Sequence, residues 1–185
     1  AYHPVWIGYD PAKGTQNGDS AGCVVIAPPM FPGGKFRILE HHQWRGMDFR
    51  AQSDAIKELT ERYNVQYIGI DSTGLGHGVL QNVREFFPAA KEFMYNPALK
   101  NALVLKAYDV ISHDRLEYDA GSNDITQSFM AIRRATTASG SRPTYEADRS
   151  EEASHADLAW ATMHALYNEP ITGENSNHHN IVEIF

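Results

Sequence analysis

Three acidic residues lie at the ends of predicted strands or at the start of a predicted helix, where the fold could bring them together. Asp10 closes the apolar run 5–10, Asp71 closes the run 67–71 before a glycine-rich turn, and Asp157 lies in a late Ala-rich segment. In an open α/β sheet the chemistry collects beyond the carboxyl ends of the strands, so acids placed there are candidate ligands or catalysts. Three carboxylates so close together repel one another, and divalent cations relieve that repulsion.

The chemistry that these acids suggest is phosphodiester hydrolysis with two metal ions. Carboxylate oxygens, with no Cys or His pair at ligand spacing, favour Mg²⁺ or Mn²⁺ over Zn²⁺. Two such ions about 4 Å apart can activate a water molecule and stabilise the leaving oxygen of a phosphodiester. His178 and His179 form an adjacent pair, but they lie in a polar segment that we assign to an exposed tail.

A structural role for two of the acids is the alternative. Asp71 could cap the helix that follows, together with Ser72 or Thr73, because short polar side chains satisfy the free amides of a helix start. Ser154 and Asp157 have the spacing of a capping box, in which Asp157 would be the third helical residue. Both roles remain open at the level of the sequence.

The elements that must position these acids follow from the hydrophobic pattern. Short apolar runs rich in β-branched and aromatic residues predict strands, and apolar residues at helical spacing predict amphipathic helices. The expected strands are 5–10, 21–27, 35–44, 67–71, 92–95 and 115–118, and the expected helices are 48–63, 79–87, 99–111, 123–134 and 154–167.

This order predicts an α/β domain with a mixed β-sheet and helices on both faces. Three strands joined by turns predict an antiparallel start, and the later alternation of helix and strand predicts parallel strands. We expect the strands that end in Asp10 and Asp71 to be neighbours, about 5 Å apart. The last helix would then bring Asp157 to the same edge of the sheet.

Length and composition are those of one ordinary domain. The chain has 185 residues, of which 42% are hydrophobic, enough for a single core. We expect a domain over residues 1–168 and a polar, mobile tail over 169–185. The single Cys23 excludes an internal disulfide, and no apolar run approaches the roughly 20 residues that span a bilayer. A soluble intracellular protein is expected, and the start at Ala1 without Met suggests a piece of a longer chain.

Charge gives two opposed indications about nucleic acid. The net charge of −7 argues against a general binder of polyanions, although an acidic metal site lowers the net charge of a nuclease until cations bind. Four arginines gather around a polar segment that could form a flexible hairpin: Arg133, Arg134, Arg142 and Arg149. They form either a solvated surface or a loop that contacts phosphates.

A nucleotide-binding P-loop is absent. Gly34-Lys35 resembles the end of such a loop, but Pro29 occupies the position of the first glycine and Phe36 replaces the Ser or Thr. The chain therefore contains no Walker A motif.

Together these segments resemble the RNase H-like nuclease domain of tailed-phage large terminase subunits. The resemblance rests on the antiparallel start ending in Asp10, the strand that closes as Ile-Asp71-Ser-Thr-Gly, and the late Ser-His-Ala-Asp157-Leu-Ala-Trp-Ala helix. It covers the chain to about Tyr167 and is closest to the terminase ATPase subunit of P2-like phages and prophages. It implies a metal-dependent endonuclease that cuts concatemeric double-stranded DNA during packaging, with Asp10, Asp71 and Asp157 as metal ligands.

The resemblance also implies partners and a setting. These are double-stranded DNA, an N-terminal ATPase domain of the full-length chain, the terminase small subunit and the portal or procapsid, in the cytoplasm of the bacterial host and without a membrane. Two alternatives remain. Another RNase H-like enzyme, such as a junction resolvase or transposase, would use the same acids, and an actin-like ATPase would place Gly74 and Gly76 near nucleotide phosphates, although that fold needs about twice this length.

Overall fold

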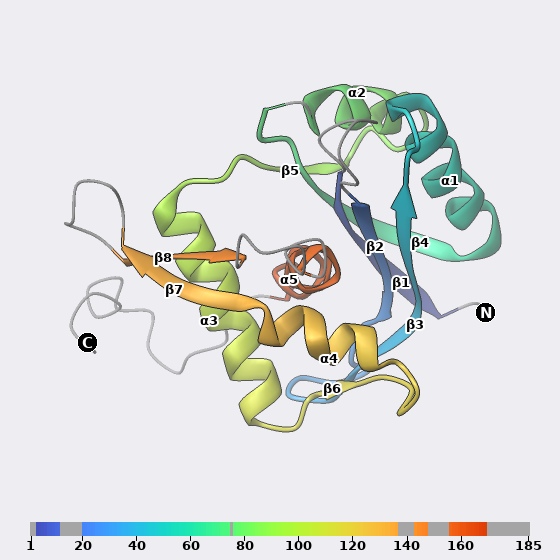
Figure 1. Ribbon diagram of the computed structural model, residues 1–185. Helices are drawn as coiled ribbons and strands as arrows, with labels where there is room; N and C mark the ends of the chain where they lie inside the picture. The colour runs from blue at the N-terminus through green and yellow to red at the C-terminus, as the bar shows by residue number, and fades with distance from the viewer. Residues whose placement is uncertain (1–2, 12–19, 75, 137–142, 148–155, 170–185) are drawn as a thin grey trace.

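The computed structural model describes residues 3–11, 20–74, 76–136, 143–147 and 156–169. Within them, a six-stranded mixed sheet forms the centre of the domain, with helices on both faces (Figure 1). The strand order is β5-β4-β1-β2-β3-β6, so the first strand lies inside the sheet. The α/β fold class expected from the sequence is confirmed.

The sheet combines an antiparallel half with parallel additions. β1, β2 and β3 form the expected antiparallel meander, while β4 runs parallel to β1, β5 to β4, and β6 to β3. The strands are β1 Pro4–Asp10, β2 Ser20–Ala27, β3 Phe36–Arg45, β4 Asn64–Asp71, β5 Lys91–Phe93 and β6 Leu116–Glu117. The strands ending in Asp10 and Asp71 are therefore neighbours, as predicted.

Two helices cover one face of the sheet. α1 (Phe49–Arg62) begins where the Asp48 side chain accepts a hydrogen bond from the amide of Ala51 at 2.8 Å, which stabilises an otherwise unpaired amide of the first turn. α2 (Gly76–Phe86) follows β4. Both pack on alternate residues of the strands, and the buried residues of this layer are Val5, Ile7, Tyr9, Ala21, Cys23, Val25, Ile56, Leu59, Ile68, Ile70, Val79, Leu80, Val83 and Ala90.

Three helices cover the opposite face: α3 (Pro97–Ser112), α4 (Asn123–Met130) and α5 (Asp157–Leu166). α5 lies directly on β1, β2 and β4, and Figure 1 shows it between the sheet and α3. Nearly every side chain of α5 is buried, as expected for a helix that is apolar on all sides.

Glycines allow α5 to approach the sheet. Gly8 and Gly69 are paired in the parallel register of β1 and β4, and Gly22 lies on the neighbouring β2. A Cβ added at Gly8 would lie 1.7 Å from the carbonyl oxygen of Ala161, and one added at Gly22 would lie 2.5 Å from the backbone of Asp157. Helix and sheet are therefore in backbone contact, which a larger residue at either position would prevent.

A two-stranded hairpin replaces part of one expected helix. We expected helix over 123–134, but α4 ends at Met130, and β7 (Ile132–Thr136) pairs with β8 (Pro143–Ala147) in antiparallel register. Cross-strand pairing outweighs the helical spacing of the preceding residues, because a tertiary partner overrides weak local propensity. The prediction of a hairpin in this region is correct, whereas the prediction of its first strand as helix is wrong.

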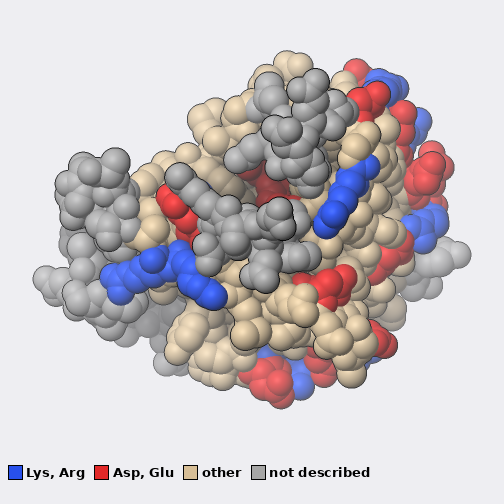
Figure 2. Space-filling view, viewed as in Figure 1, with Lys and Arg blue, Asp and Glu red and all other residues tan. Residues whose placement is uncertain are grey.

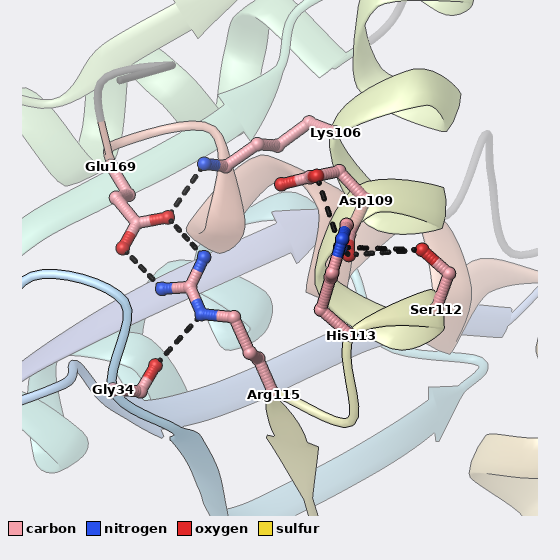
Figure 3. Close-up of polar contacts among 7 residues, drawn as sticks. All are labelled: Gly34, Lys106, Asp109, Ser112, His113, Arg115 and Glu169. Carbon is pink, nitrogen blue, oxygen red and sulfur yellow. Dashed lines mark hydrogen bonds and ion pairs between the residues drawn. The ribbon is translucent and has the colours of Figure 1, made fainter. Parts of the chain in front are cut away.

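A cluster of opposite charges joins the end of α5 to α3 and β6 (Figure 3). Lys106 donates to Glu169 at 2.6 Å, and Arg115 contacts both carboxylate oxygens of Glu169 at 2.6 and 3.2 Å. The side chains are 3%, 14% and 16% exposed for Lys106, Arg115 and Glu169. We call these three residues the Glu169 cluster. Glu169, which we expected to begin the tail, is thus held against the domain, and residues 170–185 lie outside the described residues.

The described helices are all too short or too polar to span a bilayer.

Candidate active site

Asp10 and Asp71 end adjacent parallel strands on the same face of the sheet. Tyr9 of β1 is in register with Ile70 of β4, so the acids that follow them end neighbouring strands, which lie about 4.8 Å apart. Tyr9 and Ile70 belong to the core under α1 and α2. Because side chains alternate along a strand, Asp10 and Asp71 point to the face that α5 covers.

Asp157 reaches the same place from above the sheet. It is the first residue of α5, and its backbone lies against Gly22. Gly22 is in turn the antiparallel partner of Asp10, with Cα atoms of such pairs about 5 Å apart. The three acids therefore follow one another across the edge, with Asp157 over β2, Asp10 on β1 and Asp71 on β4. We call Asp10, Asp71 and Asp157 the acidic edge.

Protein donors already hold two of these carboxylates. The amide of Thr73 donates to Asp71 Oδ1 at 2.8 Å, which forms a tight turn after β4, and Asp71 is 6% exposed. The hydroxyl of Ser20, at the start of β2, donates to Asp157 Oδ2. Both bonds favour the ionised carboxylate and restrict its orientation.

The capping-box alternative for Asp157 is wrong. The helix begins at Asp157 itself, and the preceding Ala156 is the N-cap residue, for which the described residues show no side-chain cap hydrogen bond. Asp157 is thus the first helical residue rather than the third, and its carboxylate bonds to Ser20 on another element. Ser154 lies outside the described residues.

All three carboxylates act on the hydroxyl of one tyrosine. Burial raises the pKa of Tyr95 well above its usual value, and the charges of Asp10, Asp71 and Asp157 raise it further. One hydroxyl therefore experiences all three carboxylates. Among the described residues, no group of three or more His, Cys, Asp or Glu is arranged so that it could hold a metal ion. The assignment of the acidic edge as a metal site remains a prediction.

A buried histidine lies beneath the acidic edge. His164 is fully buried, and burial lowers its pKa to about 3, so its ring is neutral at physiological pH. Its Nδ1 is 3.0 Å from the carbonyl oxygen of Tyr9, and its Nε2 is 2.6 Å from the hydroxyl of Tyr95. Both ring nitrogens are occupied by protein partners, so His164 offers no lone pair to a metal ion.

Basic side chains flank this region. Figure 2 shows acidic atoms set back near the middle of the face, in the region above α5, with Lys and Arg atoms on both sides and one group over β7. Arg133 and Arg134 are exposed on β7, whereas Arg142 and Arg149 lie outside the described residues. Contact between these arginines and phosphates remains a prediction.

Sequence reasoning missed one basic residue beside the site. Arg45 ends β3 and is in register with Ser20, the partner of Asp157. Its side chain is exposed, and none of the ion pairs among the described residues involves it. Arg45 alone carries no recognisable motif, and only the strand register places it near the acids.

A repeated tripeptide was also overlooked. Gly8-Tyr9-Asp10 and Gly69-Ile70-Asp71 share the pattern Gly-x-Asp on neighbouring strands. The glycine admits the α5 backbone, and two residues later the acid emerges on the same face. This spacing was the sequence signal that linked the site to the helix covering it.

The fold defines the class of protein. The large terminase nuclease of thermophilic phage G20c, solved with bound magnesium, matches with a TM-score of 0.72 at 19% identity, over 89% of this chain and 81% of that chain. The nuclease domain of the large terminase subunit of bacterial virus Sf6 matches with a TM-score of 0.63 at 15% identity, over 90% of this chain and 89% of that chain. The chain thus has the fold of RNase H-like terminase nuclease domains.

The family follows from sequence comparison. The model of the terminase RNaseH-like domain matches residues 7–169, and the chain belongs to this family. The terminase ATPase subunit of Escherichia phage P2 is 67% identical over 169 residues, which are 91% of this chain and 28% of that protein. The probable terminase ATPase subunit of Haemophilus phage HP1 is 42% identical over 163 residues, 88% of this chain and 26% of that protein. The chain spans little more than a quarter of the length of these relatives.

Proposed function

We propose that this chain is the nuclease domain of a phage terminase large subunit, which cuts concatemeric double-stranded DNA during packaging by metal-dependent phosphodiester hydrolysis. The observation that carries the proposal is the acidic edge, formed by Asp10, Asp71 and Asp157 in a chain of the terminase RNase H-like family. Clustering of like charges is unfavourable for the stability of the fold, because each carboxylate raises the free energy of ionising the others. Acids with only a structural role would therefore not be expected to cluster at one edge.

The donor set fits hard divalent cations. All three candidate ligands are carboxylates, both nitrogens of the nearby His164 are occupied, and Cys23 is buried on the opposite face of the sheet. Oxygen ligands of this kind select Mg²⁺ or Mn²⁺, and we propose that two such ions bind. The solved G20c and Sf6 nucleases include forms with bound magnesium and manganese, respectively.

The residues of this chain hold and orient the parts of the site. Bound ions would activate a water molecule and stabilise the leaving oxygen of the phosphodiester. Asp10, Asp71 and Asp157 supply the negative charge that holds them. Ser20 keeps the carboxylate of Asp157 directed toward the sheet, and the amide of Thr73 fixes that of Asp71.

Double-stranded DNA is the proposed substrate, and its phosphates need cationic partners around an otherwise acidic site. The exposed basic residues are Arg45, at the end of β3 and in register with Ser20, and Arg133 and Arg134 on β7. Arginines in such positions orient a duplex through phosphate contacts without reading its sequence. Arg142 and Arg149 are proposed to contribute in the same way.

The remaining partners follow from the relatives. Because the two curated relatives are terminase ATPase subunits and are much longer than this chain, we propose that an ATPase domain accompanies the nuclease domain in the full-length protein. The terminase small subunit and the portal of the procapsid are the further proposed partners, in the host cytoplasm.

The test replaces each acid by its neutral isostere. Asp10→Asn, Asp71→Asn and Asp157→Asn should each lower Mn²⁺-dependent plasmid nicking by about a thousandfold or more, because each removes a ligand charge. The melting temperature should stay level or rise, since repulsion within the acidic edge decreases. Asp54→Asn, on the exposed surface of α1, is the matched control and should nick plasmid normally.

Two results would contradict the proposal. Normal nicking by Asp71→Asn would remove the nuclease assignment. A strong preference of the unsubstituted chain for four-way junctions over linear duplex would instead favour the resolvase alternative.

A further inference from the structure

A line of four hydrogen bonds, joined through the covalent bonds of His164, Tyr95 and Thr73, runs beneath the acidic edge. The carbonyl oxygen of Tyr9 can only accept, so Nδ1 of His164 carries the proton and donates to it at 3.0 Å. Nε2 is then the acceptor, and the Tyr95 hydroxyl donates to it at 2.6 Å. The neutral imidazole is thereby fixed in one tautomer by partners on two different elements.

The line continues from Tyr95 to the second acid. The amide of Tyr95 donates to Thr73 Oγ1 at 2.8 Å, and the amide of Thr73 donates to Asp71 Oδ1 at 2.8 Å. One end therefore reaches the peptide group immediately before Asp10, and the other reaches the carboxylate of Asp71.

The histidine also ties this line to the third acid. His164 lies on α5 two turns after Asp157, so its position along the helix is coupled to that of the acid. Phe93 of β5 stacks on the imidazole, with ring centroids 4.7 Å apart and planes 19° from parallel. The ring is thus restrained in its plane as well as through its two nitrogens.

A second tyrosine provides an internal comparison. The hydroxyl of Tyr67 donates to the backbone carbonyl oxygen of His164 at 3.0 Å. It supports the same residue of the same helix, but this bond does not reach the imidazole or any acid. Loss of either hydroxyl removes one hydrogen bond to His164, and only loss of the Tyr95 hydroxyl interrupts the line.

We propose that Tyr95 and His164 are positioning residues that set the separation of Asp10 and Asp71, and thereby the affinity of the acidic edge for divalent cations. This inference rests on the function proposed above. Two ions about 4 Å apart tolerate little error in ligand position. Loss of the groups that orient metal ligands commonly lowers metal affinity by about 10 to 100-fold.

The experiment compares the variants Tyr95→Phe and Tyr67→Phe, each made in the 185-residue chain. Mn²⁺ binding is measured directly from the EPR signal of free Mn²⁺, and the rate of plasmid nicking is measured against Mn²⁺ and against DNA concentration. Tyr95→Phe should raise the Mn²⁺ concentration for half-saturation by about tenfold and leave the KM for DNA unchanged. Tyr67→Phe should lower the melting temperature to a similar extent and change half-saturation by less than about twofold.

A third variant covers the case in which Tyr95→Phe does not fold. Thr73→Val removes the Oγ1 acceptor at the exposed end of the line and keeps the side-chain volume. It should raise the half-saturating Mn²⁺ concentration in the same direction, by about threefold, since orientation is only partly lost.

The outcomes separate the two proposals. If the unsubstituted chain neither binds Mn²⁺ nor nicks plasmid, the proposed function fails. If it does both, and Tyr95→Phe and Thr73→Val bind Mn²⁺ as Tyr67→Phe does, the positioning inference alone is overturned. Equal weakening by both tyrosine variants would also overturn it, because the cause would then be a general loosening of α5.

Discussion

Two charged clusters, the acidic edge at the start of α5 and the Glu169 cluster just after its end, are balanced in opposite ways. In the Glu169 cluster, two cations surround one carboxylate, and every charge has a partner within 2.6 to 3.2 Å. In the acidic edge, three carboxylates raise the pKa of one tyrosine together. The first arrangement stabilises the fold by itself, whereas the second lowers stability unless cations bind. Charge balance therefore distinguishes the Glu169 cluster from the acidic edge.

The largest expected difference between the two clusters is in how a substitution changes the free energy of unfolding. Glu169→Gln leaves the buried ammonium of Lys106 without its counter-charge, so the free energy of unfolding should fall by about 3 kcal/mol. Asp71→Asn should leave it level or raise it, because repulsion decreases. Urea unfolding of both variants measures the difference. A loss of stability in Asp71→Asn as large as in Glu169→Gln would show that Asp71 is a structural acid.

Acid should weaken the region around His164 before it weakens the Glu169 cluster. Unfolded His164 takes up a proton near pH 6.5, whereas burial keeps it neutral in the fold down to about pH 3. The unfolded state thus binds more protons between these values, and the free energy of unfolding should fall by up to about 1.4 kcal/mol per unit as the pH drops below about 6.5.

The Glu169 cluster should respond only at lower pH. Burial tends to raise the pKa of Glu169, but hydrogen bonds from Arg115 and Lys106 hold that pKa below its usual 4.5. The stabilisation by Glu169 is therefore complete above pH 4.5 and is lost as the pH falls further.

Urea titrations at pH 7.5, 6.5 and 5.5 test the effect of His164. The free energy of unfolding should decline with falling pH, and His164→Gln should reduce this decline. An equal decline in this variant would assign the pH dependence to other groups.

The smallest expected effect concerns the arginines around the acidic edge. Arg45→Gln should reduce the slope of log affinity for duplex DNA against log salt by about one, and Arg133→Gln with Arg134→Gln by about two. Fluorescence anisotropy measurements between about 50 and 200 mM salt detect this change. Arg37→Gln, at the opposite end of β3 and paired with Glu117, is the control. Unchanged slopes would identify the three arginines as a solvated surface.

Prediction from the sequence succeeded where a few consecutive residues determine the secondary structure. Apolar runs ending in Asp10 and Asp71 identified β1 and β4, because strand burial and alternation are properties of a few consecutive residues. Prediction failed where a residue far away in the sequence determines the secondary structure or the hydrogen-bond partner. Ser20, which is 137 positions away along the chain, donates to Asp157, and pairing with β8 turns the residues after Met130 into a strand.

The same distinction applies to the candidate site. Tyr95 and His164 lie 69 positions apart and meet only because α5 packs on the sheet next to the segment that follows β5. No periodicity in the sequence links them. The Gly-x-Asp repeat, in contrast, was visible in the sequence, but its meaning depends on the helix that the glycines admit.

The backbone contact between α5 and the glycines of β1 and β2 also sets the order in which the site can form. α5 follows all six strands of the central sheet along the chain, and Gly8 and Ala161 are about 150 residues apart. During synthesis, N-terminal parts fold first, so the sheet surface beneath α5, with Trp6 and Tyr67 beside it, is made before its cover. Asp157 joins the other acids only when this helix docks. A nascent or locally opened chain therefore lacks one of the three carboxylates of the acidic edge, and under the proposed function we expect it to be inactive until the domain has closed.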